Sequence, residues 1–142
     1  MIESAIRRKR MELLTEEQTK LLIDNSHLSL EKQDKVPIAY ISTVGDGPKC
    51  KWLISEINED NSDLAYGLID LGDGNIHMGE INLNSIISLY NQNTHIFNSV
   101  GFDTDYPLAV FKAVADEFKK IVADETGLDK TFYIAQLKIY GE

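Results

Sequence analysis

Four short segments rich in β-branched and aromatic residues follow one another between residues 36 and 81, and they constrain the fold more than any other feature. They are Val36–Val44, Cys50–Ile57, Leu64–Leu71 and Ile76–Ile81. Turn-forming stretches of four to six residues separate them, such as Gly45-Asp-Gly-Pro48 and Gly72-Asp-Gly-Asn75. Parallel strands need much longer crossover connections, so these short connections predict antiparallel hairpins.

The segment before the strands is predicted to be a helix over residues 16–25. Thr15 can act as its N-cap, with Gln18 at the third helical position, which is the Thr-x-x-Gln pattern of a capping box. Leu21 and Leu22 follow at helical spacing from the start of this segment. We expect both leucines to face the core.

Three shorter elements are expected outside this framework. Residues 2–12 should form a separate helical turn or an extension of the first helix. After the fourth strand, Asn82 or Asn84 can cap a short helix. Residues 94–100 are expected to form a fifth strand.

A longer helix is predicted near the C-terminus, with Pro107 at its first position and Gly127 at its end. Its apolar residues recur at helical spacing: Leu108, Phe111, Val114, Ala115, Phe118, Ile121 and Val122. The segment Thr131–Tyr140 then predicts a final strand, with Phe132 and Ile134 on one of its faces.

These elements together predict a single α+β domain over residues 1–142. We expect a mostly antiparallel sheet of four to six strands. An N-terminal helix and a long C-terminal helix should pack on one face of that sheet.

Charge is segregated along the chain. The sixty residues from Trp52 to Phe111 contain no Lys or Arg but nine acids, whereas the remainder carries all 14 basic residues and 14 acids, so this segment accounts for the formal net charge of −9. We expect it to make one face of the fold strongly electronegative. The simpler interpretation is that acidity maintains solubility.

An acidic protein of this kind is not expected to bind nucleic acid directly, because phosphate binding needs a dense cationic surface. The charge favours a basic protein partner instead, including a nucleic-acid-binding protein whose basic surface the acidic face would cover. The run Arg7-Arg-Lys-Arg10 is expected to be solvated, or to contact the acidic centre of a second copy in a homodimer.

The only cysteine, Cys50, excludes an intramolecular disulfide and fits a reducing compartment. Apolar runs are far shorter than the roughly 18 residues of a membrane span. The basic start is not followed by the apolar stretch of a signal peptide. We therefore expect a cytoplasmic protein without membrane contact. Dinucleotide and phosphate-loop glycine patterns are missing, so we expect no cofactor.

Several motifs, taken together, resemble a known bacterial family. They are Leu13-Leu-Thr-Glu-Glu-Gln18 followed by Leu21-Leu22, then Lys51-Trp-Leu-Ile-Ser-Glu56, Asp63-Leu-Ala-Tyr-Gly-Leu-Ile-Asp-Leu-Gly-Asp-Gly74 and Gly79-Glu-Ile-Asn-Leu83. In order and spacing they resemble domain of unknown function 2958, a family often met on plasmids and phages. The resemblance covers about residues 12–88 and leaves 89–142 as a helix-strand extension. It implies a compact intracellular α+β domain of mobile-element origin and provides no catalytic residue.

The third turn carries the best candidate for a cation site. Asp73, Asn75 and His77 alternate, so an extended backbone would project them to one side. The spacing does not match a calcium loop, and zinc would require more Cys or His ligands. The simpler interpretation is a hairpin turn whose Asp and Gly residues suit the backbone conformation. We predict no metal.

Two alternatives are open for Cys50 and for the aromatic residues of the strands. Cys50 lies between two lysines, which could stabilise a thiolate, or it is a core residue at the start of a strand. Trp52, Tyr40 and Tyr66 are either core residues or an aromatic binding patch.

The favoured interpretation is a non-enzymatic interaction module with an acidic surface. Its candidate binding residues are Glu56, Glu59, Asp60, Asp63, Asp70 and Asp73. The alternative is a small enzyme or metal-binding protein in which Glu56 and Asp70 form a carboxylate pair with one raised pKa. Asp73 and His77 would complete that polar cluster.

Overall fold

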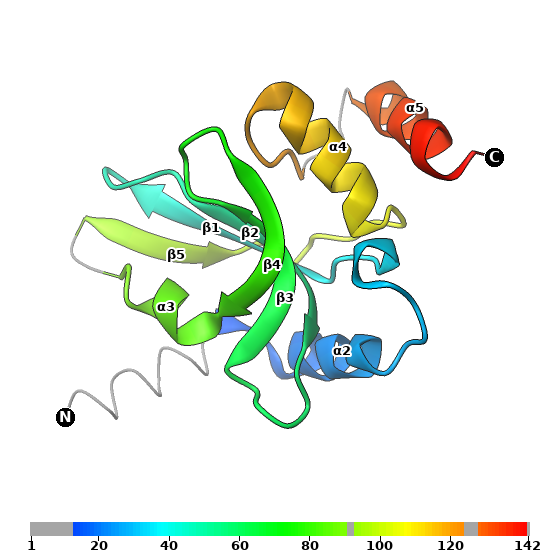
Figure 1. The fold of residues 1–142 in the computed structure, drawn as a ribbon. Helices are drawn as coiled ribbons and strands as arrows, with labels where there is room; N and C mark the ends of the chain where they lie inside the picture. Colours follow the sequence, from blue (N-terminus) through cyan, green and yellow to red (C-terminus); the bar gives the residue numbers. More distant parts are fainter. Residues whose placement is uncertain (1–12, 91–92, 124–127, 142) are drawn as a thin grey trace.

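The computed structural model describes residues 13–90, 93–123 and 128–141, which form a five-stranded sheet with helices around it (Figure 1). The strands are β1 (Ala39–Gly45), β2 (Lys51–Ile57), β3 (Leu64–Asp70), β4 (Ile76–Asn82) and β5 (Thr94–Asn98). The helices are α2 (Glu16–Ser26), the 3-10 helix η1 (Lys32–Asp34), α3 (Leu83–Ile87), α4 (Leu108–Phe118) and α5 (Asp129–Tyr140). The predicted α+β class is confirmed.

The strand order is β4-β3-β2-β1-β5, and every neighbouring pair is antiparallel. The four predicted strands and their hairpins are confirmed, although β1 begins at Ala39 rather than at Val36. The fifth strand is also confirmed over Thr94–Asn98, and it pairs with β1. The predicted cap of the short helix is Asn82, whose side-chain oxygen accepts a hydrogen bond from the Asn84 amide at 2.9 Å.

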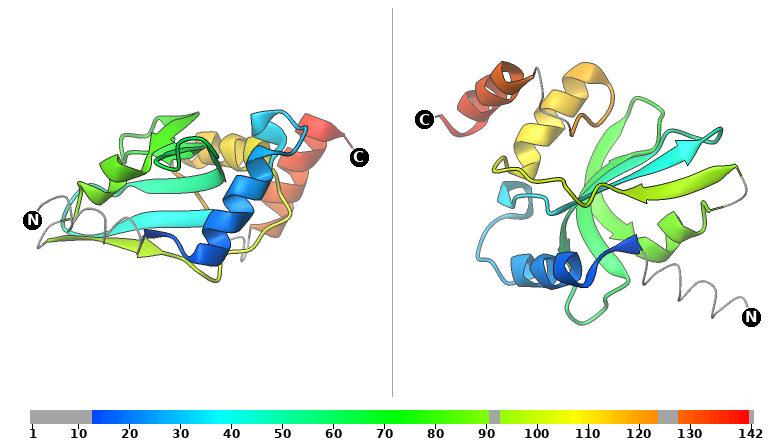
Figure 2. Two further views of the ribbon diagram at one scale, coloured as in Figure 1. Left: turned by 90° about the horizontal axis from the view of Figure 1, so that it is seen from below. Right: turned by 180° about the vertical axis from the view of Figure 1, so that it is seen from behind.

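Helices cover both faces of the sheet rather than one, which corrects the predicted arrangement (Figure 2). Alternate residues of β2 point to opposite sides. Trp52 and Ile54 join a core with residues of α2 and α3, whereas Leu53 joins a second core with α4 and α5. Because successive residues of β2 are apolar, neither face of this strand can be left in water.

The N-terminal helix has the predicted cap but not the predicted pair of inward leucines. The Gln18 amide donates to Thr15 Oγ1 at 3.0 Å, and the Thr15 amide donates to Gln18 Oε1 at 3.0 Å, which completes the capping box. Leu22 is fully buried, whereas Leu21 is 42% exposed. Successive helical residues point about 100° apart, so the sheet covers only one of them. The prediction for residues 2–12 lies outside the described residues.

The C-terminal region differs most from its prediction. The helix α4 begins after its N-cap Pro107 and ends at Phe118, where Lys119 takes a left-handed conformation with φ 62°. It therefore does not reach Gly127, which lies outside the described residues. The predicted final strand is wrong: residues 129–140 form α5, which packs beside α4 (Figure 1).

The packing of α5 explains this error. Phe132 and Ala135 are buried against the second core, and they are three residues apart, as one helix face requires. The Phe132 ring meets the Phe111 ring edge-on at 5.1 Å between centroids. The alternation of residue types in this segment fits a strand equally well, so only the contact with α4 selects the helix.

We expect Phe132→Ala to lower the free energy of unfolding by about 3–5 kcal/mol, because it removes a fully buried ring. Urea denaturation measures the loss. The matched control is Ile134→Ala, which removes a side chain that the helix leaves 40% exposed and should cost less than about 1.5 kcal/mol. Similar large losses at both positions would support the strand instead, since a strand buries both side chains on one face.

Candidate functional site

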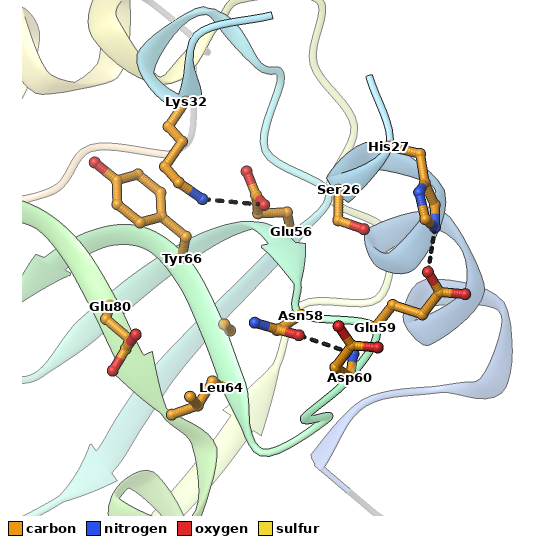
Figure 3. Close-up of a pocket in the computed structure, with 11 residues that line it drawn as sticks. Ser26, His27, Lys32, Glu56, Asn58, Glu59, Asp60, Leu64, Tyr66 and Glu80 are labelled. Carbon is orange, nitrogen blue, oxygen red and sulfur yellow. Dashed lines mark hydrogen bonds and ion pairs between the residues drawn. The ribbon is translucent and has the colours of Figure 1, made fainter. Parts of the chain in front are cut away.

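An open cleft of about 470 Å³ lies at the end of the sheet where β2 turns into β3 (Figure 3). Its walls come from the C-terminal end of α2, from η1, from the β2–β3 turn and from β3 and β4. The lining side chains are largely polar or charged: Ser26, His27, Lys32, Glu56, Asn58, Glu59, Asp60, Tyr66 and Glu80. We call it the Tyr66 cleft.

Glu56 is the buried charge of this cleft. Its Oε1 lies 3.0 Å from Lys35 Nζ and its Oε2 lies 3.2 Å from Lys32 Nζ. Glu56 and Lys35 are only 7% and 4% exposed, so each needs the other to offset the cost of leaving water. Lys32 is different, because its side chain is 53% exposed and lies at the mouth of the cleft.

A β-bulge directs Glu56 into the cleft. The pairing of β2 with β3 shifts register between Ile54 and Glu56, so that Glu56 lies opposite Tyr66. Regular alternation would have placed Glu56 on the same side as Trp52 and Ile54, inside an apolar core. The extra residue, Ser55, donates its hydroxyl to the Tyr66 carbonyl at 3.1 Å.

Tyr66 provides an aromatic wall. The Lys32 ammonium nitrogen lies 4.7 Å from the centroid of its ring, within the range of a cation–π interaction. On the other side, Tyr66 is directly opposite Glu80 of β4. The cleft thus holds a cation between a carboxylate and an aromatic face, with a second carboxylate on the neighbouring strand (Figure 3).

The β2–β3 turn adds acidic side chains to the rim. Asn58 Oδ1 accepts hydrogen bonds from the amides of Asp60 at 2.8 Å and Asn61 at 3.1 Å, which holds the turn in one conformation. Glu59 lies 2.9 Å from His27 Nε2. Asp63 lines a neighbouring groove of about 540 Å³ against α2. We call the acids around this turn the acidic end: Glu16, Asp24, Glu59, Asp60, Asp63 and Glu80.

Asp70 and Asp73 lie at the opposite end of the sheet. Asp70 is 2% exposed and accepts hydrogen bonds from the amides of Gly72 and Ile121, both at 2.9 Å. Asp73 accepts from the Asn75 amide at 3.0 Å. Both carboxylates therefore serve the chain's own backbone. The expected single acidic face is divided in two, because consecutive hairpin turns fall at opposite ends of an antiparallel sheet.

The candidate enzymatic cluster does not form. Glu56 is opposite Tyr66, whereas Asp70 lies four residues further along β3, about 13 Å away at the usual rise of a strand. His77 is exposed and lies opposite Ile69, on the other face of the sheet. Within the described ranges, no three side chains of His, Cys, Asp or Glu gather as a metal site. The predicted carboxylate pair is wrong.

Cys50 is a core residue rather than an activated thiolate. It is buried in the first core, and burial raises the pKa of its thiol, with smaller contributions from the negative charges of Asp70 and Asp73. The ammonium groups of its two lysine neighbours are hydrogen-bonded to backbone carbonyls rather than to the thiol. Lys49 donates to the Gly45 carbonyl at 2.8 Å, and Lys51 donates to the Ile121 carbonyl at 3.3 Å.

The sequence predicted Glu56 as a binding residue but missed its two lysine partners. Lys32 and Lys35 are three residues apart in a polar stretch, which is ordinary for a solvated turn. A weak signal was the position of Lys35 immediately before the apolar Val36–Val44 segment. The sequence offered Trp52, Tyr40 and Tyr66 as a possible aromatic binding patch. Trp52 is buried in the core, and of the three only Tyr66 lines the cleft.

Comparison with known proteins identifies one family. The family model described as "Protein of unknown function (DUF2958)" matches residues 13–122. This match extends past the motifs at 12–88 and includes β5 and α4. The helix α5 lies beyond the match. No curated protein and no solved structure matches this chain. None of the helices in the described part of the chain has the length and apolarity that crossing a membrane requires.

We expect Glu56→Gln to lower the free energy of unfolding by about 3 kcal/mol, because it leaves the buried Lys35 ammonium without a counter-charge. Urea denaturation at neutral pH measures the change. Glu80→Gln, at an exposed carboxylate of the same cleft, is the control and should change stability by less than about 0.5 kcal/mol. An equally small loss in both variants would contradict the buried ion pair.

Cys50 should react slowly with a disulfide reagent at pH 8. Its raised pKa lowers the thiolate fraction, and burial blocks access, so the rate in the folded protein should be at least about tenfold below that in denaturant. Absorbance of the released thiolate gives the rate. A reaction rate in the folded protein above that of the unfolded chain would instead support the interpretation of Cys50 as an activated thiolate.

Proposed function

This chain belongs to the DUF2958 family of proteins of unknown function, and we propose that it is a non-enzymatic module that binds a basic partner protein through the acidic end. The observation that carries the proposal is the convergence of carboxylates from α2, the β2–β3 turn and β4 around two neighbouring concave surfaces. Several like charges on one rim attract a cationic surface more strongly than scattered charges do.

The geometry of the β2–β3 turn supports this role. Of its acidic residues, Glu59 and Asp60 are exposed, while the Asn58 side chain accepts hydrogen bonds from the amides of Asp60 and Asn61. A rim that is already ordered loses little conformational entropy when a partner binds. By contrast, Asp70 and Asp73 are engaged by backbone amides, so they are not part of the proposed surface.

We propose that the partner is an intracellular protein. The family resemblance implies plasmid or phage origin, and a cytoplasmic location is part of the proposal. Basic proteins that bind nucleic acid are a suitable partner class, because the acidic end would compete with phosphate for their cationic surface. Direct binding of nucleic acid is not proposed, since phosphates would be repelled by the same carboxylates.

Replacing Glu59, Asp60 and Asp63 by lysine reverses three charges and should weaken binding of a short poly-arginine peptide at least about tenfold. Isothermal titration calorimetry measures the affinity. Raising the salt concentration from ~50 mM to ~300 mM should weaken wild-type binding as well, because exposed charges are screened.

The matched control reverses three exposed acids elsewhere: Asp46, Glu117 and Asp129. It changes the net charge equally but leaves the acidic end intact, so binding should fall less than about threefold. Equal losses of affinity in the two variants would show that net charge alone controls binding, and they would reject the proposed surface. The alternative is a homodimer, in which the chain's own basic run would occupy the acidic end of a second copy. Light scattering distinguishes it from a monomer by the mass of the particle in solution.

A further inference from the structure

Lys32 places an ammonium group where a partner's basic side chain would be expected to bind. We infer that the Tyr66 cleft is an arginine-binding pocket, and that Lys32 occupies it until the guanidinium group of a partner displaces it. This inference rests on the proposed function, because it names the anchor by which a basic partner would attach.

The contacts of Lys32 define what the pocket recognises. Its ammonium group lies between the Glu56 carboxylate, at 3.2 Å, and the face of the Tyr66 ring, at 4.7 Å from the centroid. Glu80 lies on the strand beside Tyr66, and Glu59 and Asp60 are on the rim. An anion would meet these carboxylates, so the pocket is built for a positive charge.

Lys32 can leave without exposing an uncompensated charge. Lys35 is 4% exposed and holds Oε1 of Glu56, whereas Lys32 holds Oε2 and is 53% exposed. Displacement of Lys32 therefore frees one carboxylate oxygen while the inner ion pair stays intact. Lys32 itself belongs to a three-residue 3-10 helix, and its long side chain can rotate into water.

A guanidinium group suits the vacated place better than a second ammonium group. It is planar, so it can stack on the Tyr66 ring while donating to Glu56 from its edge. It is also more weakly hydrated, so it costs less to bring into a partly enclosed cleft. The cleft volume of about 470 Å³ is in the range of small-ligand sites and leaves room for one arginine side chain.

The test compares removal of Lys32 with removal of another lysine at the same end of the molecule. n-Butylguanidinium is the probe, and its affinity is measured by NMR titration, with the backbone amide resonances of β2, β3 and β4 as the reporter. Lys32→Met should tighten binding at least threefold, because the probe no longer competes with a resident cation. The control Lys20→Met removes the same charge from exposed α2 and should change affinity less than about 1.5-fold.

A second comparison tests the recognition itself. n-Butylammonium should bind the Lys32→Met variant more weakly than n-butylguanidinium does, and Tyr66→Leu should remove the preference between the two probes. Equal effects of Lys32→Met and Lys20→Met would overturn the inference. That comparison stands even if Tyr66→Leu fails to fold, because both lysine side chains are exposed.

The two proposals fail in distinguishable ways. Charge reversal at Glu59, Asp60 and Asp63 tests the acidic end with a peptide, whereas Lys32→Met tests one pocket with a small probe. If reversal weakens peptide binding but Lys32→Met behaves as Lys20→Met does, the proposed function stands and the arginine pocket is wrong. If only Lys32→Met has its expected effect, the pocket binds guanidinium groups but the acidic end does not serve a basic protein.

Discussion

Burial of β2 on both faces is the constraint on which the rest of the structure depends. Trp52, Leu53 and Ile54 are all buried, and alternate side chains of a strand point in opposite directions. A single layer of helices cannot shield both faces. The chain therefore places α2 and α3 on one side and α4 and α5 on the other. The charged residue two positions after this apolar run, Glu56, then has to be accommodated at the border of the core.

The accommodation of Glu56 links the fold to the candidate site. One extra residue in β2 turns Glu56 toward Tyr66, away from the core that contains Trp52. The connection before β1 then supplies Lys35 for the inner oxygen and Lys32 for the outer oxygen of the carboxylate. Burial makes the inner pair a structural necessity, whereas exposure leaves the outer lysine exchangeable. A requirement of folding thus produces a cation-holding cleft at the end of the sheet.

Much of the fold could be predicted because its determinants are local. The short turns between residues 36 and 81 permit only hairpins, and Thr15 and Gln18 complete their capping box within one helical turn. The segment 129–140 could not be assigned this way. Its apolar residues satisfy both a two-residue and a helical period, and the choice depends on the contact of Phe132 with Phe111 across a sequence separation of 21 residues.

The amino-acid sequence by itself determined the antiparallel hairpins, the acidic centre of the chain and the family to which it belongs, since each is carried by neighbouring residues or by their order. Tertiary structure alone decided how the acids are used. The hairpins send Asp70 and Asp73 to one end of the sheet and Glu59, Asp60 and Asp63 to the other. The bulge in β2 places Glu56 between two lysines that are distant from it in sequence. Electrostatic interactions act through space, so the position of a charge along the chain does not reveal which charge it will meet.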